Sequence, residues 1–480
     1  MSPSDLTAVL PELLLVTVGC VLVLLDAFAP SQRPRFAPLT VVAVLAAAVL
    51  RWATPLPGAV WSGSLTVDAM ARFVDSYVLL AVLLAVAMAD PYLVRTRTRL
   101  GEFHALLLWS AVGAMVMAKA DHFLTVFLGL ELLSICLYAL NAFHRDSNLS
   151  LEAGWKYLVV GAFASALLLF GIALVYGATG TFRLSGLVEA VAARRAPADL
   201  LLVGGIALLL AGLGFKLALV PFHPWAPDVY QGSPTPVTAF LSVVPKGAAL
   251  VVLARIVAFA APATLSSRWT VLLAAIAVAS MTLGNLVAIA QREIKRMLAY
   301  SGIAHMGYAL VGVVAFGVDG LAGVLVYLAA YTFMNVAAFT VVSAFSESED
   351  EPHLITDLAG QGWDRPVLSL ALALAMLSLA GIPPTVGFVG KFLVFRAAVN
   401  QGMVWLAVIG VLNSLVSVFF YVRVIYLLYM KPLPKRAPAY SEPWPARLVA
   451  VACAVAIVVL GILPGWVMNA AEAAARTLAR

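Results

Sequence analysis

The feature that most constrains this chain is a succession of apolar runs, each of about 18–25 residues, joined by short connectors. A helix of that length crosses the hydrocarbon core of a bilayer. Of the 480 residues, 63% are hydrophobic and only 11% are charged, whereas soluble domains average roughly 25% charged residues. A soluble fold could not hide so much apolar surface. Because the runs also lack the period-two alternation of membrane β-strands, the expected fold class is an all-α polytopic membrane protein.

The pattern predicts about fourteen transmembrane helices. Their expected limits are 6–27, 36–54, 71–90, 102–119, 122–143, 153–177, 200–221, 236–260, 269–290, 296–316, 320–345, 366–382 continuing to 400, 404–430 and 444–468. The start of the chain has no basic segment and no small-residue cleavage site, so we interpret 6–27 as a spanning helix rather than a cleaved signal. No soluble domain fits between the spans, which predicts a single membrane domain over residues 1–480.

Basic connectors predict the orientation, because Lys and Arg accumulate on the cytoplasmic side of a membrane. Four basic segments fall on one side under this count, namely 30–35, 95–99, 291–296 and 431–436. The N-terminus is therefore expected outside, and an even number of spans places the C-terminus outside as well. The formal charge of +6 fits these connectors. No basic patch is interleaved with aromatics, so nucleic-acid binding is not expected.

Two spans are interrupted by proline, in LALVPFHPWAPDVYQGSPTPV and in LAGIPPTVGFVGKF. Proline removes an amide donor and clashes with the preceding turn. Non-helical backbone persists at membrane depth only inside protein or beside water. The segments GLGFK and VGFVGK resemble each other weakly and lie about five spans apart, and an odd number of helices reverses topology. Paired interruptions of this kind are typical of inverted repeats around a transport path.

Five ionisable side chains lie inside the apolar runs: Glu131, Lys216, Lys246, His305 and Lys391. A charge at a helix centre in a bilayer costs about 2.5–3.5 kcal/mol on insertion scales. A chain that carries several such residues is expected to need titratable groups at membrane depth. A buried lysine can exchange a proton near neutral pH, because burial shifts its titration by several units. These residues therefore predict a proton relay, with Glu131 as the natural partner of Lys216.

Other interpretations remain open at this point. Glu131 and Lys216 could form a structural ion pair that locks two helices, although the surplus of buried cations argues against a lock. Lys246 could extend to the membrane surface, but about ten residues, or roughly 15 Å of helix, separate it from either end of its span. His305 could pass a proton between its two ring nitrogens or could be a satisfied hydrogen-bonding residue.

Further polar residues accompany the interruptions and His305. Those beside His305 are Tyr300, Ser301 and Tyr308. His223, Asp228 and Tyr230 form the polar edge of the first interruption, where they could either open a proton uptake path to the cytoplasm or cap the broken helix ends. Four carboxylates lie near span ends and are expected to face water: Glu12, Asp26, Asp75 and Asp90.

The three cysteines, Cys20, Cys136 and Cys453, each lie alone in an apolar run. The sequence has no CxxC, no paired Cys/His set and no GxGxxG that opens a βαβ unit. No iron–sulfur cluster, structural zinc or bound dinucleotide is therefore expected in this chain. Free cysteines in such settings act as small hydrophobic residues.

Three segments carry a resemblance to a known family. GFKLALVPFHPWAPDVYQGSPTPVTAFLSVVPKGA resembles the signature of the antiporter-like membrane subunits of respiratory complex I and of the related Mrp antiporters. QREIKRMLAYSGIAHMGY and GIPPTVGFVGKF resemble the segments around the tenth and twelfth helices of that family. Within it, DVYQGSPTPV and Lys391 are closer to the N-type subunits than to the L and M types. The resemblance extends over essentially the whole chain.

The resemblance implies an arrangement for the fourteen helices. Helices 1–3 would occupy residues 1–101, a first repeat of helices 4–8 would occupy 102–260, and a second, inverted repeat of helices 9–13 would occupy 269–430. Helix 14 would lie in 444–480, and helices 7 and 12 would be the broken ones.

The resemblance also implies a function. The chain would be a proton-translocating module of a bacterial NADH:quinone oxidoreductase, with the five buried residues along a hydrated central axis. It would hold no cofactor, because NADH, FMN, iron–sulfur clusters and quinone would belong to partner subunits. Those partners would be subunits M, K, J and L with its lateral helix, in the inner membrane. The alternative is an Mrp-type cation/proton antiporter that works without an oxidoreductase, and DVYQGSPTPV argues against it.

Overall fold

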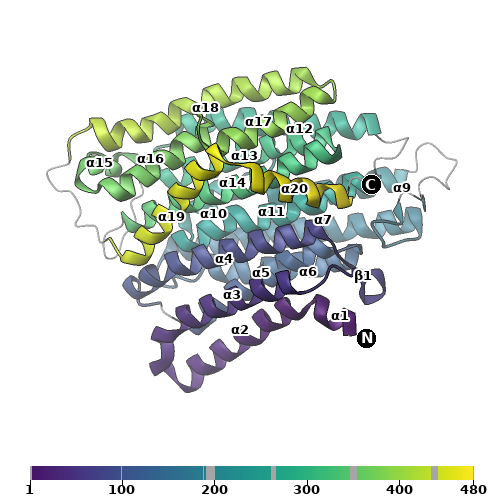
Figure 1. Ribbon diagram of the computed structural model, residues 1–480, viewed down its shortest axis with the longest axis horizontal. Coiled ribbons are helices and arrows are strands. Elements are labelled where there is room, and N and C mark those ends of the chain that lie inside the picture. The colour runs from purple at the N-terminus through teal and green to yellow at the C-terminus, as the bar shows by residue number, and fades with distance from the viewer. Residues whose placement is uncertain are drawn as a thin grey trace.

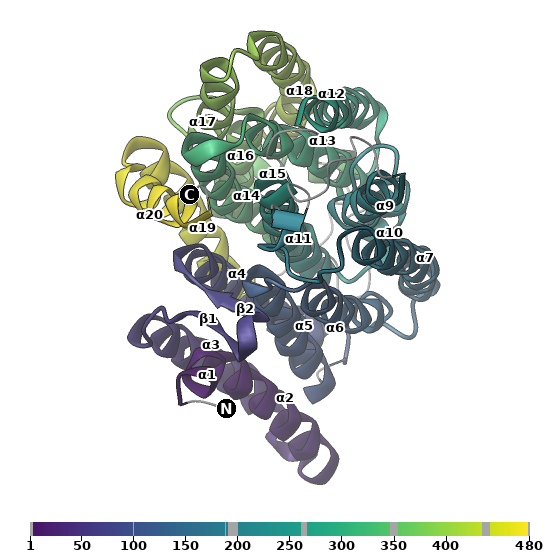
Figure 2. The same cartoon turned by 90° about the vertical axis from the view of Figure 1, so that its right-hand side faces the viewer.

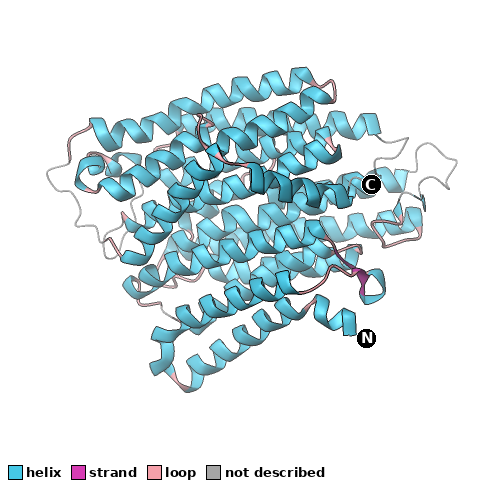
Figure 3. Cartoon of the chain, viewed as in Figure 1, coloured by secondary structure: helices cyan, strands magenta, loops and turns pink. Residues whose placement is uncertain are grey.

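The computed structural model describes residues 3–98, 100–187, 189–190, 200–260, 266–345, 354–433 and 442–478. Long helices lie side by side along one direction (Figure 1), and the secondary-structure colouring of Figure 3 is helical almost throughout. One short hairpin interrupts this pattern. Its strands, β1 (Gly58–Val60) and β2 (Leu65–Val67), are antiparallel, with Gly58 opposite Val67.

In chain order, the helices are grouped by the four ranges that the resemblance implies. The first contains α1 (Pro3–Ala8), α2 (Leu10–Phe28), α3 (Phe36–Ala53) and α4 (Ala69–Arg95). The second contains α5 (Gly101–Lys119), α6 (Phe123–Asn141), α7 (Asn148–Thr179), α9 (Leu200–Leu217), α10 (Trp225–Gly232) and α11 (Thr235–Ala260). The third contains α12 (Ser266–Ala290), α13 (Ile294–Ala315), α14 (Gly317–Ala344), α15 (Gln361–Asp364), α16 (Pro366–Ala380), α17 (Val386–Asn400) and α18 (Val404–Met430). The last contains α19 (Trp444–Ile462) and α20 (Gly465–Leu478).

Within the described ranges, 13 helices are long and apolar enough to cross a membrane. The interrupted pair α16–α17, with 15 residues on each side of the break, supplies one further crossing. The prediction of an all-α polytopic fold is confirmed. The last span ends earlier than expected, at Ile462, because Pro464 has no amide donor to continue the helix. The chain then continues as α20, which buries Val467 and Ala471.

The two breaks occur where the sequence predicts them. The first separates α9 from α11 and contains the short helix α10, and the second separates α16 from α17. Counting each broken pair as one, the broken helix is the fourth of five in both the second and the third group. Both termini lie at the same end of the helices, at the right of Figure 1, as an even number of crossings requires.

Three helices form the interior of the bundle. All residues in the apolar stretch of α11 are buried, as are 94% of those in α13 and 89% in α14, against 33% in α7 and α18. In the end-on view of Figure 2, α11 and α14 lie near the middle of the bundle. Because outer helices expose their aliphatic side chains, polar groups on α11, α13 and α14 are enclosed by protein. This interior contains Lys246 and His305.

Candidate functional site

Glu131 and Lys216 lie on neighbouring parts of the bundle, on α6 and near the end of α9. Lys216 is 2% exposed, and its Nζ donates to the hydroxyl of Tyr157 on α7 at 3.1 Å. Glu131 is close enough for its charge to act on the ammonium, but its Oε1 has no hydrogen-bond partner among the described residues. A cavity of about 10 Å³ lies against Lys216, Leu130 and Ser165. That volume is about the space of one water beside the Lys216 ammonium.

The first break is closed by backbone and aromatic contacts. Ala218 adopts a positive φ of 54°, and the next amide, that of Leu219, donates to Gly214 O at 2.8 Å. The indole N–H of Trp225 donates to Phe215 O at 2.9 Å, which satisfies a carbonyl at the end of α9. His223 lies half-buried in the break, and burial lowers the pKa of His223. The break is therefore partly capped from within.

Asp228 on α10 is an anchor between two helices. It accepts from Lys156 of α7 at 3.1 Å and from Arg296 of α13 at 2.6 Å. Burial acts to raise the pKa of Asp228, but hydrogen bonds from Arg296 and Lys156 outweigh burial and hold the pKa below its usual value. Asp228 therefore keeps its negative charge around neutral pH and fixes α10 in place. Of the two interpretations that the sequence left open, this geometry favours the structural one for Asp228.

An aromatic wall separates Lys216 from Lys246. Tyr157 stacks on Trp225 with ring centroids 4.7 Å apart, and Trp225 meets Tyr230 edge-on at 6.5 Å. Lys246 is 1% exposed, and its Nζ lies 5.3 Å from the centroid of the Tyr230 ring. A cation over an aromatic face is attracted by the ring quadrupole. The Lys246 ammonium has no hydrogen-bond partner in the described part of the chain.

His305 has a hydrogen-bonding partner on each of its two ring nitrogens. Its Nδ1 lies 2.6 Å from the hydroxyl of Tyr327 on α14, and its Nε2 lies 3.1 Å from the hydroxyl of Tyr421 on α18. The Tyr421 hydroxyl is also 2.5 Å from Ser301 Oγ. Each ring nitrogen thus meets a group that can both donate and accept. The imidazole can therefore take a proton at one side and give it up at the other.

Lys391 is held at the second break. Its Nζ donates to Leu379 O at 2.9 Å, to Ala380 O at 3.0 Å and to Ser414 Oγ at 2.8 Å. The two carbonyls are at the end of α16, where the break leaves them without helical partners. Nζ also lies 4.8 Å from the centroid of the Tyr308 ring. The break therefore provides the acceptors for an ammonium inside the bundle.

The remaining residues that the sequence singled out differ in placement. Tyr308 is fully buried, and its hydroxyl accepts from Asn285 at 2.9 Å. Tyr300 is half-buried against the apolar core. Sequence reasoning missed five tyrosines that contact the ionisable residues: Tyr138, Tyr157, Tyr327, Tyr331 and Tyr421. The sequence feature that could have identified them is a tyrosine inside an apolar run. Tyr327 and Tyr331 are also one helical turn apart.

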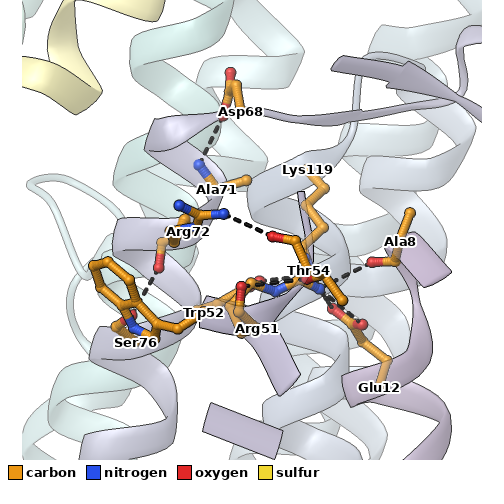
Figure 4. A network of polar contacts seen from close by, with 11 residues as sticks. Ala8, Glu12, Arg51, Trp52, Thr54, Asp68, Ala71, Arg72, Ser76 and Lys119 are labelled. Atoms are coloured by element: carbon orange, nitrogen blue, oxygen red, sulfur yellow. Dashed lines mark hydrogen bonds and ion pairs between the residues drawn. The ribbon is translucent and has the colours of Figure 1, made fainter. Parts of the chain in front are cut away.

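A second set of buried charges contradicts an expectation from the sequence. Glu12 and Asp75 do not face water, since they are 4% and 0% exposed. Arg51 forms ion pairs with Glu12 at 3.3 Å and Asp75 at 2.8 Å, and Lys119 forms ion pairs with Asp75 at 2.8 Å and with Glu12. Figure 4 shows Glu12, Arg51 and Lys119 converging from separate helices. The four residues form a closed ring of alternating charge, called the charge ring below.

The sequence did not predict the charge ring, because Glu12 and Asp75 were expected to face water only on the ground that they lie near the ends of spans. A residue near the end of a span faces water only if its side of the helix is not covered by another helix. The sequence did hold a signal, since Glu12 and Asp75 follow the starts of two spans while Arg51 and Lys119 precede the ends of two others. Antiparallel helices place these four positions at the same end of the bundle.

Comparisons with known proteins agree with this architecture. The transmembrane family described as NADH:quinone oxidoreductase/Mrp antiporter matches residues 120–417. NADH-quinone oxidoreductase subunit N of Trichlorobacter lovleyi is 42% identical over 478 residues, which are 99% of this chain and 98% of that protein. A chain of respiratory complex I from Thermus thermophilus with bound aureothin is 34% identical, with a TM-score of 0.82, and the similarity covers 96% of this chain and 98% of that one.

A chain of the Mrp complex from Dietzia has a similar fold, with a TM-score of 0.86 over 100% of this chain and 98% of that one. Its identity is only 23%, so this likeness concerns the fold alone. The full-length relative at 42% identity is a subunit N. Together with the two broken helices and the buried ionisable residues, this similarity identifies the chain as a member of the subunit N family, the antiporter-like, proton-translocating membrane subunits of NADH-quinone oxidoreductase.

Proposed function

We propose that protons move through this chain along Glu131, Lys216, Lys246, His305 and Lys391, in that order. The observation that carries the proposal is the environment of His305, whose two ring nitrogens each meet a tyrosine hydroxyl from a different helix. Such an arrangement is suited to passing a proton through the imidazole.

The acidic end of the relay acts as the switch. While Glu131 is ionised, its charge favours the ammonium form of Lys216. When redox chemistry elsewhere in the complex neutralises or displaces that charge, Lys216 releases its proton toward Lys246. The proton then passes the His305 network and reaches Lys391 at the second break. The half-buried His223 in the first break is placed to take part in proton uptake, whereas Asp228 anchors α10.

The neighbours of the chain follow from its family. NADH, FMN, the iron–sulfur clusters and quinone are held by partner subunits of the complex, in a bacterial inner membrane. Subunits M, K and J and the lateral helix of subunit L are the expected contacts in the membrane arm. Both termini are expected on the outer side.

The proposed division of the chain follows its two breaks. Residues 1–101 carry the first three spanning helices, 102–260 and 269–430 form two inverted five-helix repeats, and 444–480 form the C-terminal segment. The support is the position of the broken helix, fourth of five in each repeat.

The test is a pair of substitutions at Lys216 in the intact complex. Lys216→Ala leaves Glu131 without its cation, so the relay has one state and quinone-linked proton pumping should fall about tenfold or more, with assembly retained. Lys216→Arg keeps the positive charge but cannot release a proton, because arginine stays protonated under nearly all conditions. Pumping is measured in inverted vesicles as proton uptake per NADH oxidised.

The arginine variant separates a relay from a helix lock. A structural ion pair tolerates Arg, whereas a proton relay does not. Lys431→Arg, at an exposed position beyond α18, is the matched control and should pump normally. Normal pumping by Lys216→Arg would show that Lys216 is a lock and that protons travel elsewhere.

A further inference from the structure

Gly302 on α13 occupies the point where the side chains of two other helices meet. A Cβ atom at Gly302 would lie 2.8 Å from the Tyr331 hydroxyl oxygen, on α14, and 2.9 Å from Lys246 Nζ, on α11. Both distances are shorter than a carbon atom keeps from its neighbours in ordinary packing. Any other amino acid at this position would therefore have to displace the ammonium and the phenol together.

The two polar tips that converge on Gly302 are deeply buried. Lys246 is 1% exposed and Tyr331 is 0% exposed. Neither Nζ of Lys246 nor Oη of Tyr331 has a hydrogen-bond partner among the residues that the structure describes. A buried polar group without a partner costs about 1–3 kcal/mol. Packing alone does not explain why the ammonium of Lys246 and the hydroxyl of Tyr331 both lie beside Gly302, because each would cost less free energy if it had a hydrogen-bond partner.

The His305 network begins on the same helix, next to Gly302. Ser301 is the preceding residue, and its hydroxyl contacts Tyr421, which in turn contacts His305 Nε2. The ring of Tyr331 lies 5.2 Å from the His305 ring, centroid to centroid. Gly302 therefore lies between the end of the Lys246 side chain and the first groups of the His305 network.

We infer that Gly302 is a positioning residue, whose missing side chain keeps open the passage between the Lys246 ammonium and the Tyr331 hydroxyl. The inference rests on the proposed relay. One proton and no electrons move in this step. Lys246 gives up its proton and becomes a neutral amine, and the Tyr331 hydroxyl accepts that proton as it releases its own. The His305 imidazole, through the hydroxyls on its two ring nitrogens, gains one proton and becomes an imidazolium. A methyl group in the passage would separate the two groups with an atom that can neither donate nor accept.

The experiment compares Gly302→Ala with Gly302→Ser in the intact complex in inverted vesicles. Alanine fills the passage with a methyl group, and proton uptake per NADH oxidised should fall about tenfold. Serine is larger, but its hydroxyl both donates and accepts. It should therefore recover most of the pumping that alanine loses. If Gly302 served packing alone, serine would be as harmful as alanine or worse, and that result would overturn the inference.

Two glycine substitutions serve as controls for packing. Gly307→Ala lies on the same helix, where a Cβ would lie 2.8 Å from Met281 Cγ and 2.9 Å from Ala277 O. It should lower the yield of assembled complex without changing the protons moved per NADH. At Gly177 on α7, a Cβ would meet nothing within 4 Å, so Gly177→Ala should change neither quantity.

A second variant covers the case in which Gly302→Ala fails to assemble. Tyr331→Phe removes the hydroxyl without adding volume, and pumping should fall by a similar factor. Normal pumping by Tyr331→Phe, or by Gly302→Ala, contradicts the inference. Lys246→Ala identifies which proposal has failed. If it pumps normally, the relay itself is wrong; if it stops pumping while Gly302→Ala pumps, only the role of Gly302 is wrong.

Discussion

At the scale of single residues, the three buried lysines differ in what surrounds their ammonium groups. Lys391 donates to two carbonyls and a serine, Lys216 donates to one phenol, and Lys246 lies over the face of an aromatic ring. Burial of a charge is costly unless hydrogen bonds compensate it. Hydrogen bonds therefore fix the position of the Lys391 ammonium, whereas the Lys246 ammonium is held by its contact with the aromatic ring.

Asp228 provides a prediction at this scale, because its ion pairs can be removed without touching the relay. Asp228→Asn should lower the free energy of unfolding by at most about 1 kcal/mol, since the side chain is 38% exposed, and should leave pumping within about twofold of normal. If the variant stops pumping while it assembles normally, Asp228 carries protons after all.

The pH dependence of Asp228 follows from the direction of its pKa shift. Its pKa is lowered in the fold, so the ion pairs stabilise the protein above the carboxyl's unfolded pKa of about 3.9. That contribution is lost only as the pH falls through the lower, folded pKa. The difference in thermal unfolding between parent and Asp228→Asn should therefore be nearly the same at pH 7 and at pH 6, should shrink as the pH falls below about 5, and should vanish in stronger acid.

At the scale of elements, a broken helix leaves backbone carbonyls without helical partners, and these carbonyls can bind a buried ammonium group. The end of α16 leaves Leu379 O and Ala380 O without helical amides, and Lys391 of α17 takes both. The chain can turn there because Gly381 adopts a φ of +86°, a conformation that other residues rarely adopt. The break therefore determines where the Lys391 ammonium can rest.

Gly381→Ala tests this dependence. A side chain in the left-handed region costs about 1–2 kcal/mol, and a Cβ at Gly381 would also lie 2.9 Å from Lys391 Cδ. Both stability and pumping should fall. Gly402→Ala is a matched control, because Gly402 has a φ of +77° with nothing within 4 Å of its Cβ position. It should lose similar stability and keep its pumping. Equal pumping by the two variants would show that the second break does not position Lys391.

At the scale of the whole molecule, the charge ring joins the first three spanning helices to the antiporter core. Glu12, Arg51, Asp75 and Lys119 come from α2, α3, α4 and α5, one charge from each. Arg255 extends the connection inward, because its Nε donates to Ala118 O at 3.0 Å and its Nη2 pairs with Asp68 at 3.1 Å. Arg255 lies on α11, the helix that also carries Lys246. The N-terminal helices are thus tied to the helix at the centre of the relay.

The charge ring predicts strongly non-additive mutations. Lys119→Met leaves a net negative charge buried in the ring and should destabilise the protein by about 3–5 kcal/mol. Adding Asp75→Asn removes the excess charge and should recover a large part of that loss. Thermal unfolding of the purified complex measures both effects. Additive losses in the double variant would mean that the two side chains do not act on one another.

The sequence alone predicted the fold class, the two breaks and the identity of the five ionisable residues. Apolar length decides which segments span a membrane, and proline decides where a helix must stop, so both are local properties of the chain. Lys216, Lys246, His305 and Lys391 could be found because a charge inside an apolar run is visible without any knowledge of its neighbours.

Only the tertiary structure decided which side chains meet. Glu12 and Asp75 are near span ends like many exposed carboxylates, yet helix packing covers them and pairs them with Arg51 and Lys119. Of the tyrosines around His305, Tyr327 comes from α14, the next helix along the chain, whereas Tyr421 comes from α18, 116 residues away. The hydropathy of a segment indicates whether it spans the membrane and therefore whether a residue within it lies at membrane depth. The direction in which its side chain points, and therefore its partner, depends on the rotation and packing of helices from separate parts of the chain.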